Sequence, residues 1–442
     1  MKKYNLHMKL RNIQISNYRN FKDYLIDFGT ETTIFIGKNG TGKTNLITAI
    51  KQSLSFIFSN RKTDIQYDFL ASSDQKVNSF MITDARYTYE AEQGFPQYPV
   101  SIKAETDDMS PNIQWELYKE NASTGLNEHL YRTANEQYWK QYYEDGKITK
   151  KLPVFAFFSD SYPHITTTFR GTNMEKMLNS GNPLPKNAAY YKWDEEKNCT
   201  EIWVQYYTMQ WKNVNWNNRG NKDYIEAVNQ SLIAFSDSVS KESNKDDIKI
   251  EKLDLEPRGT DDVLIVVFNN GNRIPFSQLP QGYKRIFSIA FDIANRAYML
   301  NANCNPSGIV IIDEIELHLH PSIAQVILTG LKTTFPNIQF LVSTHSPLVI
   351  TNFRQDDKNI LYKLYNEDGE YKNAKVDDLY GIDYNSGLRD WMETPYRNSD
   401  VNDLIESYKY WKSAGDNEMI NRLKEKIKDA VGNDSELYKS LN

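Results

Sequence analysis

The sequence predicts an α/β fold in which a mixed or parallel sheet is flanked by helices, and two stretches of the chain lead to this prediction. In the first, an apolar strand at 32–36 runs into a glycine-rich loop, and residues 45–58 then carry apolar side chains at helical spacing. In the second, the apolar strands 308–312 and 338–342 are separated by a predicted helix at 321–334. Strands that alternate with helices form parallel sheets through crossover connections.

The other elements follow from the same periodicities. We expect a strand, a turn and a second strand over 11–28, strands at 100–104, 113–117 and 152–158, helices at 202–211, 224–236 and 285–300, and a hairpin at 263–276. The tail is charged and helical in pattern, with a break near Gly415. No sustained heptad pattern is present, so we expect no long coiled coil.

These elements divide the chain into four predicted parts. Residues 1–58 and 251–396 form the two parts of one main domain, residues 59–250 contain an inserted subdomain of mixed α/β character with part of the main domain, and residues 397–442 form a helical tail. The apolar positions of the tail make its helices amphipathic. We expect them to pack on the chain's own main domain, and docking of another subunit is the alternative.

Composition and charge exclude several classes of protein. The formal net charge is −6, so the chain lacks the global basic field that would hold nucleic acid. Its two cysteines, Cys199 and Cys304, lie at no metal-ligand spacing, which is typical of proteins kept in the reducing cytoplasm. The sequence has no apolar run of about 18 residues and no signal-peptide pattern, so neither a membrane span nor secretion is expected.

The glycine-rich loop, Gly37–Thr44, has the spacing G-x-x-x-x-G-K-[ST] of a phosphate-binding loop. Its glycines let the backbone curl so that successive N–H groups face phosphates, and the following helix adds its positive end. A chance match in a glycine-rich turn is the alternative, but the flanking strand and helix favour a nucleotide site. We expect Lys43 to reach the β- and γ-phosphates and Thr44 to ligate Mg²⁺. The residues expected to bind the nucleotide are Gly37, Lys38, Asn39, Gly40, Thr41, Gly42, Lys43, Thr44 and Asn45.

A pair of acids ends the apolar strand 308–312. In open α/β sheets, ligands bind at the carboxyl ends of the strands, where Asp313 and Glu314 stand. We expect Asp313 to hold Mg²⁺, directly or through water, and Glu314 to act as the general base on an attacking water. Such a pair is common by itself, but it becomes specific in a chain that also carries a phosphate-binding loop.

Three histidines follow these strands. His345 comes directly after the strand 338–342, where its side chain can reach a γ-phosphate, and a polar loop residue without that role is the alternative. His318 and His320 alternate on a short loop. A metal site there lacks a third clear ligand, so we favour loop contacts at a subunit interface.

These motifs together resemble those of the RecF/SMC-like ABC ATPases. The matching segments are residues 17–21, the phosphate-binding loop, 313–321 and 343–347. They look more closely like the coil-less bacterial group that includes the ATPase subunit PtuA of Septu antiphage systems and related retron effectors. The resemblance implies an ABC-type P-loop ATPase head that uses ATP and Mg²⁺. Catalytic roles are then expected for Glu314, His345 and Lys43.

The family also carries a signature, Leu-Ser-x-Gly-x-x-Arg, ahead of the second acidic strand. Here Leu279, Gly282 and Arg285 match, but Pro280 replaces the serine that meets the γ-phosphate held by a partner subunit. Proline offers neither a hydroxyl nor a backbone N–H, although it suits the first turn of a helix. We therefore expect Gly282 and the helix terminus to face phosphate, with weaker contact across the dimer and slow turnover.

Two further features of the family have no secure position in this chain. Gln66 and Gln75 are the candidates for the Q-loop residue, and an ordinary polar residue on the surface is the alternative for each. Tyr18 and Phe21 are placed to pack near an adenine, and core packing explains them equally well.

The resemblance implies a cytoplasmic ATPase that forms a homodimer or higher oligomer around nucleotide. The stretch after His345 is too short for the Toprim nuclease domain often fused to such ATPases, so we expect a separate effector such as an HNH nuclease. DNA contact is then expected mainly through that partner. A RecF-like repair ATPase that binds DNA directly is one alternative, and a non-hydrolysing nucleotide sensor or scaffold is another.

Overall fold

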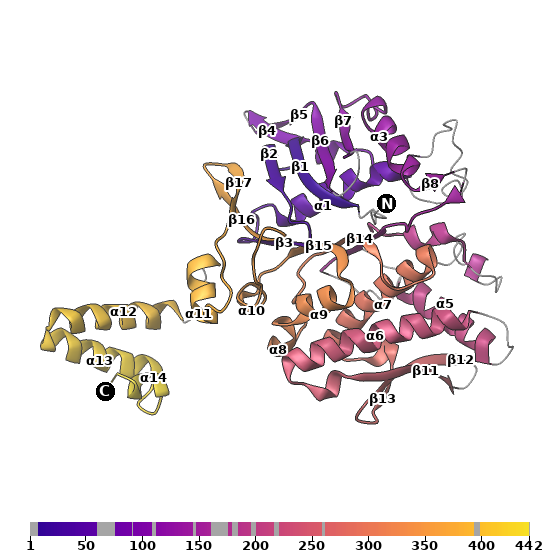
Figure 1. Ribbon diagram of the computed structural model, residues 1–442. Coiled ribbons are helices and arrows are strands. Elements are labelled where there is room, and N and C mark those ends of the chain that lie inside the picture. The colour runs from indigo at the N-terminus through magenta and orange to yellow at the C-terminus, as the bar shows by residue number, and fades with distance from the viewer. Residues whose placement is uncertain are drawn as a thin grey trace. The chain divides into compact units, whose positions relative to one another are not determined.

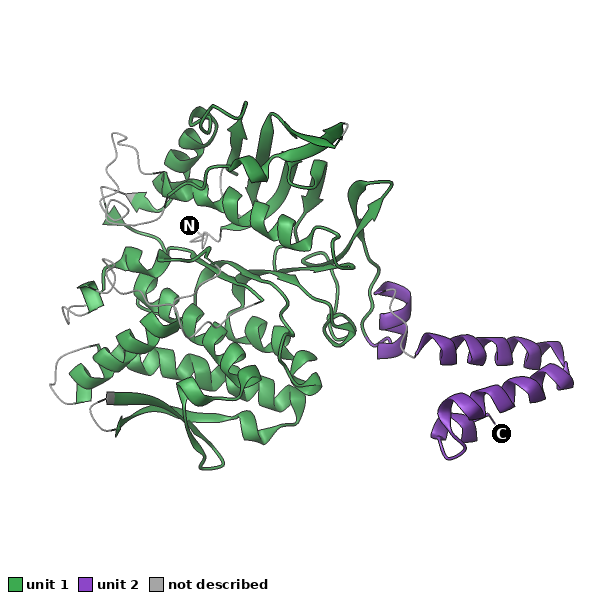
Figure 2. Cartoon of the chain, turned by 180° about the vertical axis from the view of Figure 1, so that it is seen from behind, with its two compact units in different colours: residues 1–380 green, residues 381–442 purple. Residues whose placement is uncertain are grey.

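The computed structural model describes residues 8–59, 76–90, 92–107, 112–144, 147–160, 176–178, 184–195, 200–215, 221–258, 261–392 and 398–441. The chain forms two compact units, Met1–Tyr380 and Gly381–Asn442 (Figure 2). In the part of the chain that is described, no helix is long and apolar enough to cross a membrane.

A six-stranded sheet organises the first unit. Its strand order is β10 (Val154–Phe158), β14 (Ser307–Ile312), β15 (Asn337–Ser343), β3 (Thr32–Ile36), β16 (Asn359–Glu367) and β17 (Glu370–Lys375). Each neighbouring pair is parallel except β16 and β17, which are antiparallel. Every residue of β3, β10 and β14 is buried, as expected for strands covered on both faces. The predicted α/β fold class is confirmed.

A second, antiparallel sheet lies on one side of the first. Its order is β2 (Phe21–Asp27), β1 (Lys9–Tyr18), β6 (Val100–Asp107) and β7 (Gln114–Lys119). It lies with α1 (Lys43–Leu54), α3 (His129–Lys140) and the hairpin β4 (Arg86–Glu90) and β5 (Gln93–Gln97) on the same side in Figure 1. The Gln339 side chain of β15 joins the two sheets, because its amide bonds to the backbone N–H and carbonyl of Leu10 at 2.7 and 2.8 Å.

The carboxyl end of α1 is closed by side chains from this second layer. The 3-10 turn Ser55–Phe58 continues α1 and leaves backbone carbonyls without helical partners. The indole N–H of Trp115 donates to the Ser53 carbonyl at 2.8 Å, and that of Trp139 to the Ile57 carbonyl at 2.9 Å. The Asn135 amide donates to the carbonyls of residues 56 and 57 at 2.9 Å each. The helix that follows the phosphate-binding loop is therefore anchored at its far end.

Helices and a small sheet cover the opposite side of the six-stranded sheet (Figure 1). They are α5 (Thr200–Asn215), α6 (Lys222–Ser243), α7 (Gln281–Asn301), α8 (Pro321–Ala324), α9 (Ile327–Thr334) and the strands β11 (Ile250–Arg258), β12 (Asp261–Phe268) and β13 (Arg273–Pro275). The single helix predicted at 321–334 is wrong: Val326, with φ −120°, separates α8 from α9. Helix α7 is buried along most of its length.

The second unit is a helical hairpin with its own small core. Helices α12 (Ser399–Ala414) and α13 (Asn417–Val431) pack through a core of Ile405, Tyr408, Leu423 and Ile427. Short helices α11 (Tyr384–Ser386) and α14 (Glu436–Lys439) flank them. The predicted break at Gly415 is confirmed, since this glycine ends α12 with φ 77°, in the left-handed region.

Candidate functional site

The glycine-rich loop leaves β3 after Ile36 and enters α1 at Lys43. Gly37, Gly40 and Gly42 have φ angles of 151°, 81° and 94°, which residues with a Cβ rarely adopt. A Cβ on Gly37 would lie 2.3 Å from the Leu364 carbonyl oxygen. The loop therefore has the curled backbone that the sequence predicts.

Lys43 lies over its own loop. Its ammonium donates to the carbonyls of Gly37 and Lys38 at 2.7 and 2.9 Å, and the side chain is buried. Burial lowers the pKa of Lys43, while the carboxylates of Asp313 and Glu314 act in the opposite direction. The cation of the loop is thus close to the acids of β14.

The acids stand at the carboxyl end of β14, as predicted. Asp313 is 7% exposed, and its carboxylate accepts a hydrogen bond from the Ser343 hydroxyl. Burial raises the pKa of Asp313, and burial together with Asp313 raises the pKa of Glu314. A cation relieves such a crowded pair of carboxylates.

The residues present fit a magnesium ion. Mg²⁺ binds to proteins through one or two carboxylate or hydroxyl oxygens and completes its shell with phosphate and water. Asp313 supplies a buried carboxylate with a raised pKa. Thr44 is the second residue of α1 and is exposed. The oxygens of these two side chains are of the kind that Mg²⁺ takes, and the assignment of Thr44 and Asp313 as its ligands stays a prediction.

His345 lies between these two halves of the site, because β15 separates β3 from β14 in the sheet. Its backbone N–H donates to a carboxylate oxygen of Glu316 at 2.7 Å, and the Thr344 hydroxyl donates to the other oxygen at 2.6 Å. Burial and the nearby ammonium of Lys43 lower the pKa of His345. Its imidazole is therefore neutral at neutral pH.

The Arg285 side chain makes hydrogen bonds within its own chain. Its guanidinium is fully buried and donates to the carbonyls of Asp313 and Glu314 at 2.8 and 3.0 Å. It also donates to the carbonyls of Ser159 and Asp160 at 3.1 and 3.2 Å. The arginine of the signature segment thus ties α7 to the ends of β10 and β14.

The rest of the signature segment forms the start of α7. Pro280 is the N-cap residue, and Leu279 before it is buried. Gly282 lies in the first turn against the loop after β14, where a Cβ would come within 2.7 Å of the His318 carbonyl oxygen. This close approach explains why glycine is needed at this position.

The turn between β1 and β2 packs against the start of α1. Asn45 accepts a hydrogen bond from Arg19 at 3.1 Å and donates to Asn20 at 2.8 Å. Tyr18 and Phe21 are 0% and 1% exposed and belong to the hydrophobic core. Core packing therefore explains these two aromatic side chains.

Two histidines, His318 and His320, lie in the loop after β14. His320 caps α8, and its Nδ1 lies 3.1 Å from the Lys245 ammonium. His318 has φ 64°. Among the residues that the structure describes, no group of three or more His, Cys, Asp or Glu side chains is placed to hold a metal ion.

Sequence reasoning missed three side chains of this site. Asp160 is the second residue after β10, as Glu314 is after β14, and its charge helps to raise the pKa of both Asp313 and Glu314. The position of Asp160 after an apolar strand is the signal from which the sequence could have identified it. Ser343 and Glu316 are found only from their contacts across β14 and β15. The Q-loop candidates Gln66 and Gln75 lie outside the described residues.

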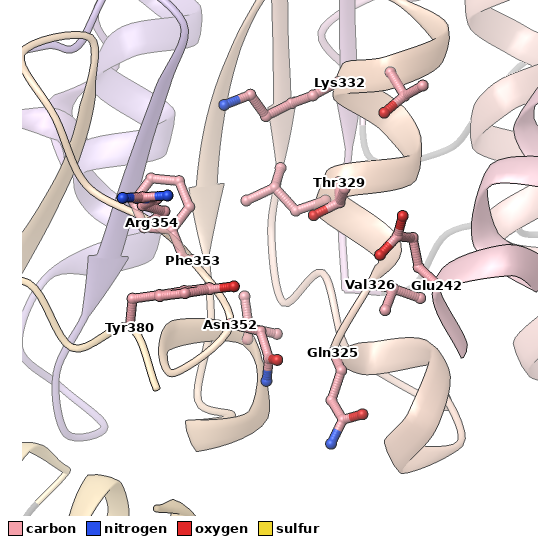
Figure 3. Close-up of a pocket in the computed structure, with 12 residues that line it drawn as sticks. Glu242, Gln325, Val326, Thr329, Lys332, Asn352, Phe353, Arg354 and Tyr380 are labelled. Atoms are coloured by element: carbon pink, nitrogen blue, oxygen red, sulfur yellow. The ribbon is translucent and has the colours of Figure 1, made fainter. Parts of the chain in front are cut away.

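A pocket of about 450 Å³ lies elsewhere in the first unit. Figure 3 shows it between α9 and the segment 352–354, with Arg354 beside the Tyr380 ring and Glu242 and Gln325 across from them. None of the predicted site residues lines this pocket.

Known proteins that are similar to this chain show the family to which it is related. A family described as AAA ATPase domain matches residues 8–350. The retron Vc95 probable ATPase of Vibrio cholerae serotype O1 biovar El Tor is 28% identical over 400 residues, which cover 81% of this chain and 74% of that protein. The Septu protein PtuA of Bacillus mycoides (strain KBAB4) is 31% identical over 182 residues, 37% of this chain and 24% of that protein. The predicted resemblance to this group is confirmed.

Several solved structures are also similar to this chain. The SMC head domain from Thermotoga maritima aligns with a TM-score of 0.45 at 14% identity, over 84% of this chain and 100% of that chain.

Proposed function

Because the chain belongs to the AAA ATPase domain family, we propose that it binds ATP with Mg²⁺, hydrolyses it slowly, dimerises around the nucleotide and thereby gates a partner effector. The observation that carries this proposal is the meeting of three segments at one edge of the six-stranded sheet. The loop after β3, the acids after β14 and the histidine after β15 lie on adjacent parallel strands.

Each half of the site has a distinct role in this proposal. The loop N–H groups and Lys43 hold the phosphates, and the phosphates replace the carbonyls that Lys43 now contacts. Thr44 and Asp313 hold Mg²⁺, which when bound neutralises charge that develops on the phosphates. Glu314 accepts the proton of the attacking water, and neutral His345 donates a hydrogen bond toward the γ-phosphate.

Slow turnover follows from the signature segment. Pro280 caps α7 without a side-chain hydrogen bond, and its ring nitrogen has no proton to donate. In a dimer, the first turn of α7 then offers a partner's γ-phosphate fewer donors than a serine would allow. A long-lived ATP-bound dimer suits a protein that signals a nucleotide state, since the ligand shifts the population toward the closed form.

The defence role rests on the names of the relatives. One is a probable ATPase of a retron, and the other is a Septu protein. We propose that this chain likewise acts in antiphage defence, in the cytoplasm, together with a separate effector. The effector is a nuclease, for which an HNH enzyme is the first candidate, and contact with DNA is made mainly through it.

Calorimetry and phosphate release test the ATPase. The parent chain should bind Mg-ATP and release phosphate, and Glu314→Gln should bind Mg-ATP with similar affinity but release phosphate at least about 100-fold more slowly. Light scattering should show that Glu314→Gln becomes dimeric on adding ATP. Hydrolysis by Glu314→Gln at the parent rate would show that the base is assigned wrongly, and absence of Mg-ATP binding by the parent would refute the proposal.

The effector is tested in cells that carry the native system. The tagged chain should co-purify with a nuclease whose activity changes with ATP, and Lys43→Ala should abolish that dependence. Salt-sensitive binding of bare DNA by the isolated chain would instead favour a repair ATPase. ATP binding without phosphate release, with the partner present, would favour a nucleotide sensor.

A further inference from the structure

The proposed base stands on a strained stretch of backbone. Glu314 has φ 49°, in the left-handed region that side chains with a Cβ disfavour. Such a conformation persists only where the surroundings fix it, and it is common at functional sites. The conformation matters because it sets the direction in which the Glu314 side chain leaves the strand end.

Contacts on both sides of Glu314 fix this conformation. Its backbone N–H donates to the Ser343 hydroxyl at 2.9 Å, and the N–H of Ile315 donates to the Ser343 carbonyl at 3.2 Å. Its own carbonyl accepts from Nη2 of Arg285 at 3.0 Å. The same nitrogen donates to the Asp313 carbonyl at 2.8 Å. One arginine therefore holds the carbonyls of both acids.

The guanidinium of Arg285 suits this task. It is 0% exposed, and its other terminal nitrogen, Nη1, donates to the carbonyls of Ser159 and Asp160 at the end of β10. A guanidinium presents its N–H groups in a rigid planar fork, which the single flexible ammonium of lysine cannot reproduce. The fork thus keeps the ends of two parallel strands in one arrangement.

We propose that Arg285 is a positioning residue for Glu314: by holding the carbonyls of residues 313 and 314 it maintains the left-handed backbone that aims the carboxylate of the base. Arg285 acts within its own chain, although it belongs to the segment whose start is expected to meet a partner's nucleotide. This inference rests on the proposed function, because it assigns Arg285 a part in the hydrolysis that Glu314 promotes.

The same helix provides a matched control. Arg296 of α7 is 3% exposed and also donates to backbone carbonyls, those of Ala189 and Tyr191 at 2.6 and 3.1 Å. It is paired with Asp292, and neither Asp292 nor the two residues whose carbonyls it holds belong to the phosphate site. Arg296→Lys therefore tests a buried arginine with a purely structural role.

The experiment compares the full-length parent chain, Arg285→Lys and Arg296→Lys at saturating Mg²⁺. Arg285→Lys should lower kcat about tenfold or more and leave the Kd for Mg-ATP within about threefold of the parent value, because the phosphate loop is untouched. Arg296→Lys should keep kcat within about threefold, whatever stability it loses. If Arg285→Lys does not fold, Arg285→Gln, which keeps a planar N–H donor group, takes its place and should give the same separation of kcat from Kd.

Three results would overturn the inference. An unchanged kcat in Arg285→Lys, or in Arg285→Gln where the lysine variant does not fold, would show that Glu314 does not depend on these contacts. Equal losses of kcat in Arg285→Lys and Arg296→Lys would show a general structural effect. Absence of turnover in the parent chain would refute the proposed function and this inference with it, whereas the first two results leave the proposed function intact.

Discussion

The geometry of the phosphate-binding loop makes a quantitative prediction about two of its glycines. In Gly37→Ala, the new methyl group would lie 2.3 Å from the carbonyl oxygen of Leu364 and 2.6 Å from the Thr41 hydroxyl. The first obstacle is backbone of β16, which pairs with β3 beside the loop, so it cannot move without parting two strands. Overpacking of this kind and the φ of 151° together cost about 3–5 kcal/mol.

Gly40→Ala provides the contrast within the same loop. Gly40 has φ 81°, so a Cβ is disfavoured there too, but no atom lies within 4 Å of the position that it would take. The left-handed backbone costs roughly 1–2 kcal/mol, and the loss of freedom in the unfolded chain returns about 0.4–1 kcal/mol. The net cost should be about 1 kcal/mol.

Urea unfolding of the nucleotide-free protein, followed by tryptophan fluorescence, measures both costs. Gly37→Ala should lose at least about 2 kcal/mol more free energy of unfolding than Gly40→Ala. Losses that agree within about 0.5 kcal/mol, or a greater loss in Gly40→Ala, would refute the loop geometry from which the nucleotide site is built.

Four other variants or conditions test the site and its support. Lys43→Ala should abolish the heat of Mg-ATP binding in a calorimeter, and binding at the parent affinity would contradict the assigned role of the loop. Pro280→Ser should strengthen ATP-dependent dimerisation in light scattering, because it adds a hydroxyl and a backbone N–H at the start of α7; unchanged dimerisation would argue against that segment meeting a partner's nucleotide. Asn135→Leu should lower the free energy of unfolding by about 1–3 kcal/mol, since it removes two buried hydrogen bonds, those to the carbonyls of residues 56 and 57. Because the folded-state pKa values of Asp313 and Glu314 lie above their ordinary values of 3.8 and 4.5, their contribution to stability is present below those values and is lost as pH rises through the raised ones; Mg²⁺ should therefore raise the thermal midpoint more at pH 7.5 than at pH 5.

Local patterns were sufficient for the centre of the fold. The strands β3, β14 and β15 each contain a short apolar run, and the glycines at 37, 40 and 42 mark the loop by spacing alone. Strand β17 was missed because it has no buried residue, and β16 was missed, although its first part is buried, because Lys363 interrupts its apolar residues. The approach of α9 to α6 at Gly330, where a Cβ would meet Val239 at 2.7 Å, also leaves no periodic signal.

Some residues of the site were predicted from the sequence and others were not, because only some of them belong to a local pattern. Residues that contact a ligand carry a motif, whereas residues that hold them in place are recognised by partners distant in sequence. Arg285 reaches carbonyls 28 and 29 residues away and others 125 and 126 residues away. The sequence placed it in a segment that faces a partner, and only the folded chain shows that its guanidinium is turned inward.

The closure of α1 by Trp115, Asn135 and Trp139 has a consequence for recombining this protein with its relatives. The donors lie 62 to 82 residues beyond the carbonyls that they satisfy. A chimaera that exchanges residues 112–144 without supplying equivalent donors would lose these hydrogen bonds, and it would loosen the helix on which the phosphate loop is mounted. Crossover points that keep residues 112–144 together with α1 should yield foldable hybrids, because the donors and the carbonyls that they satisfy are then inherited together.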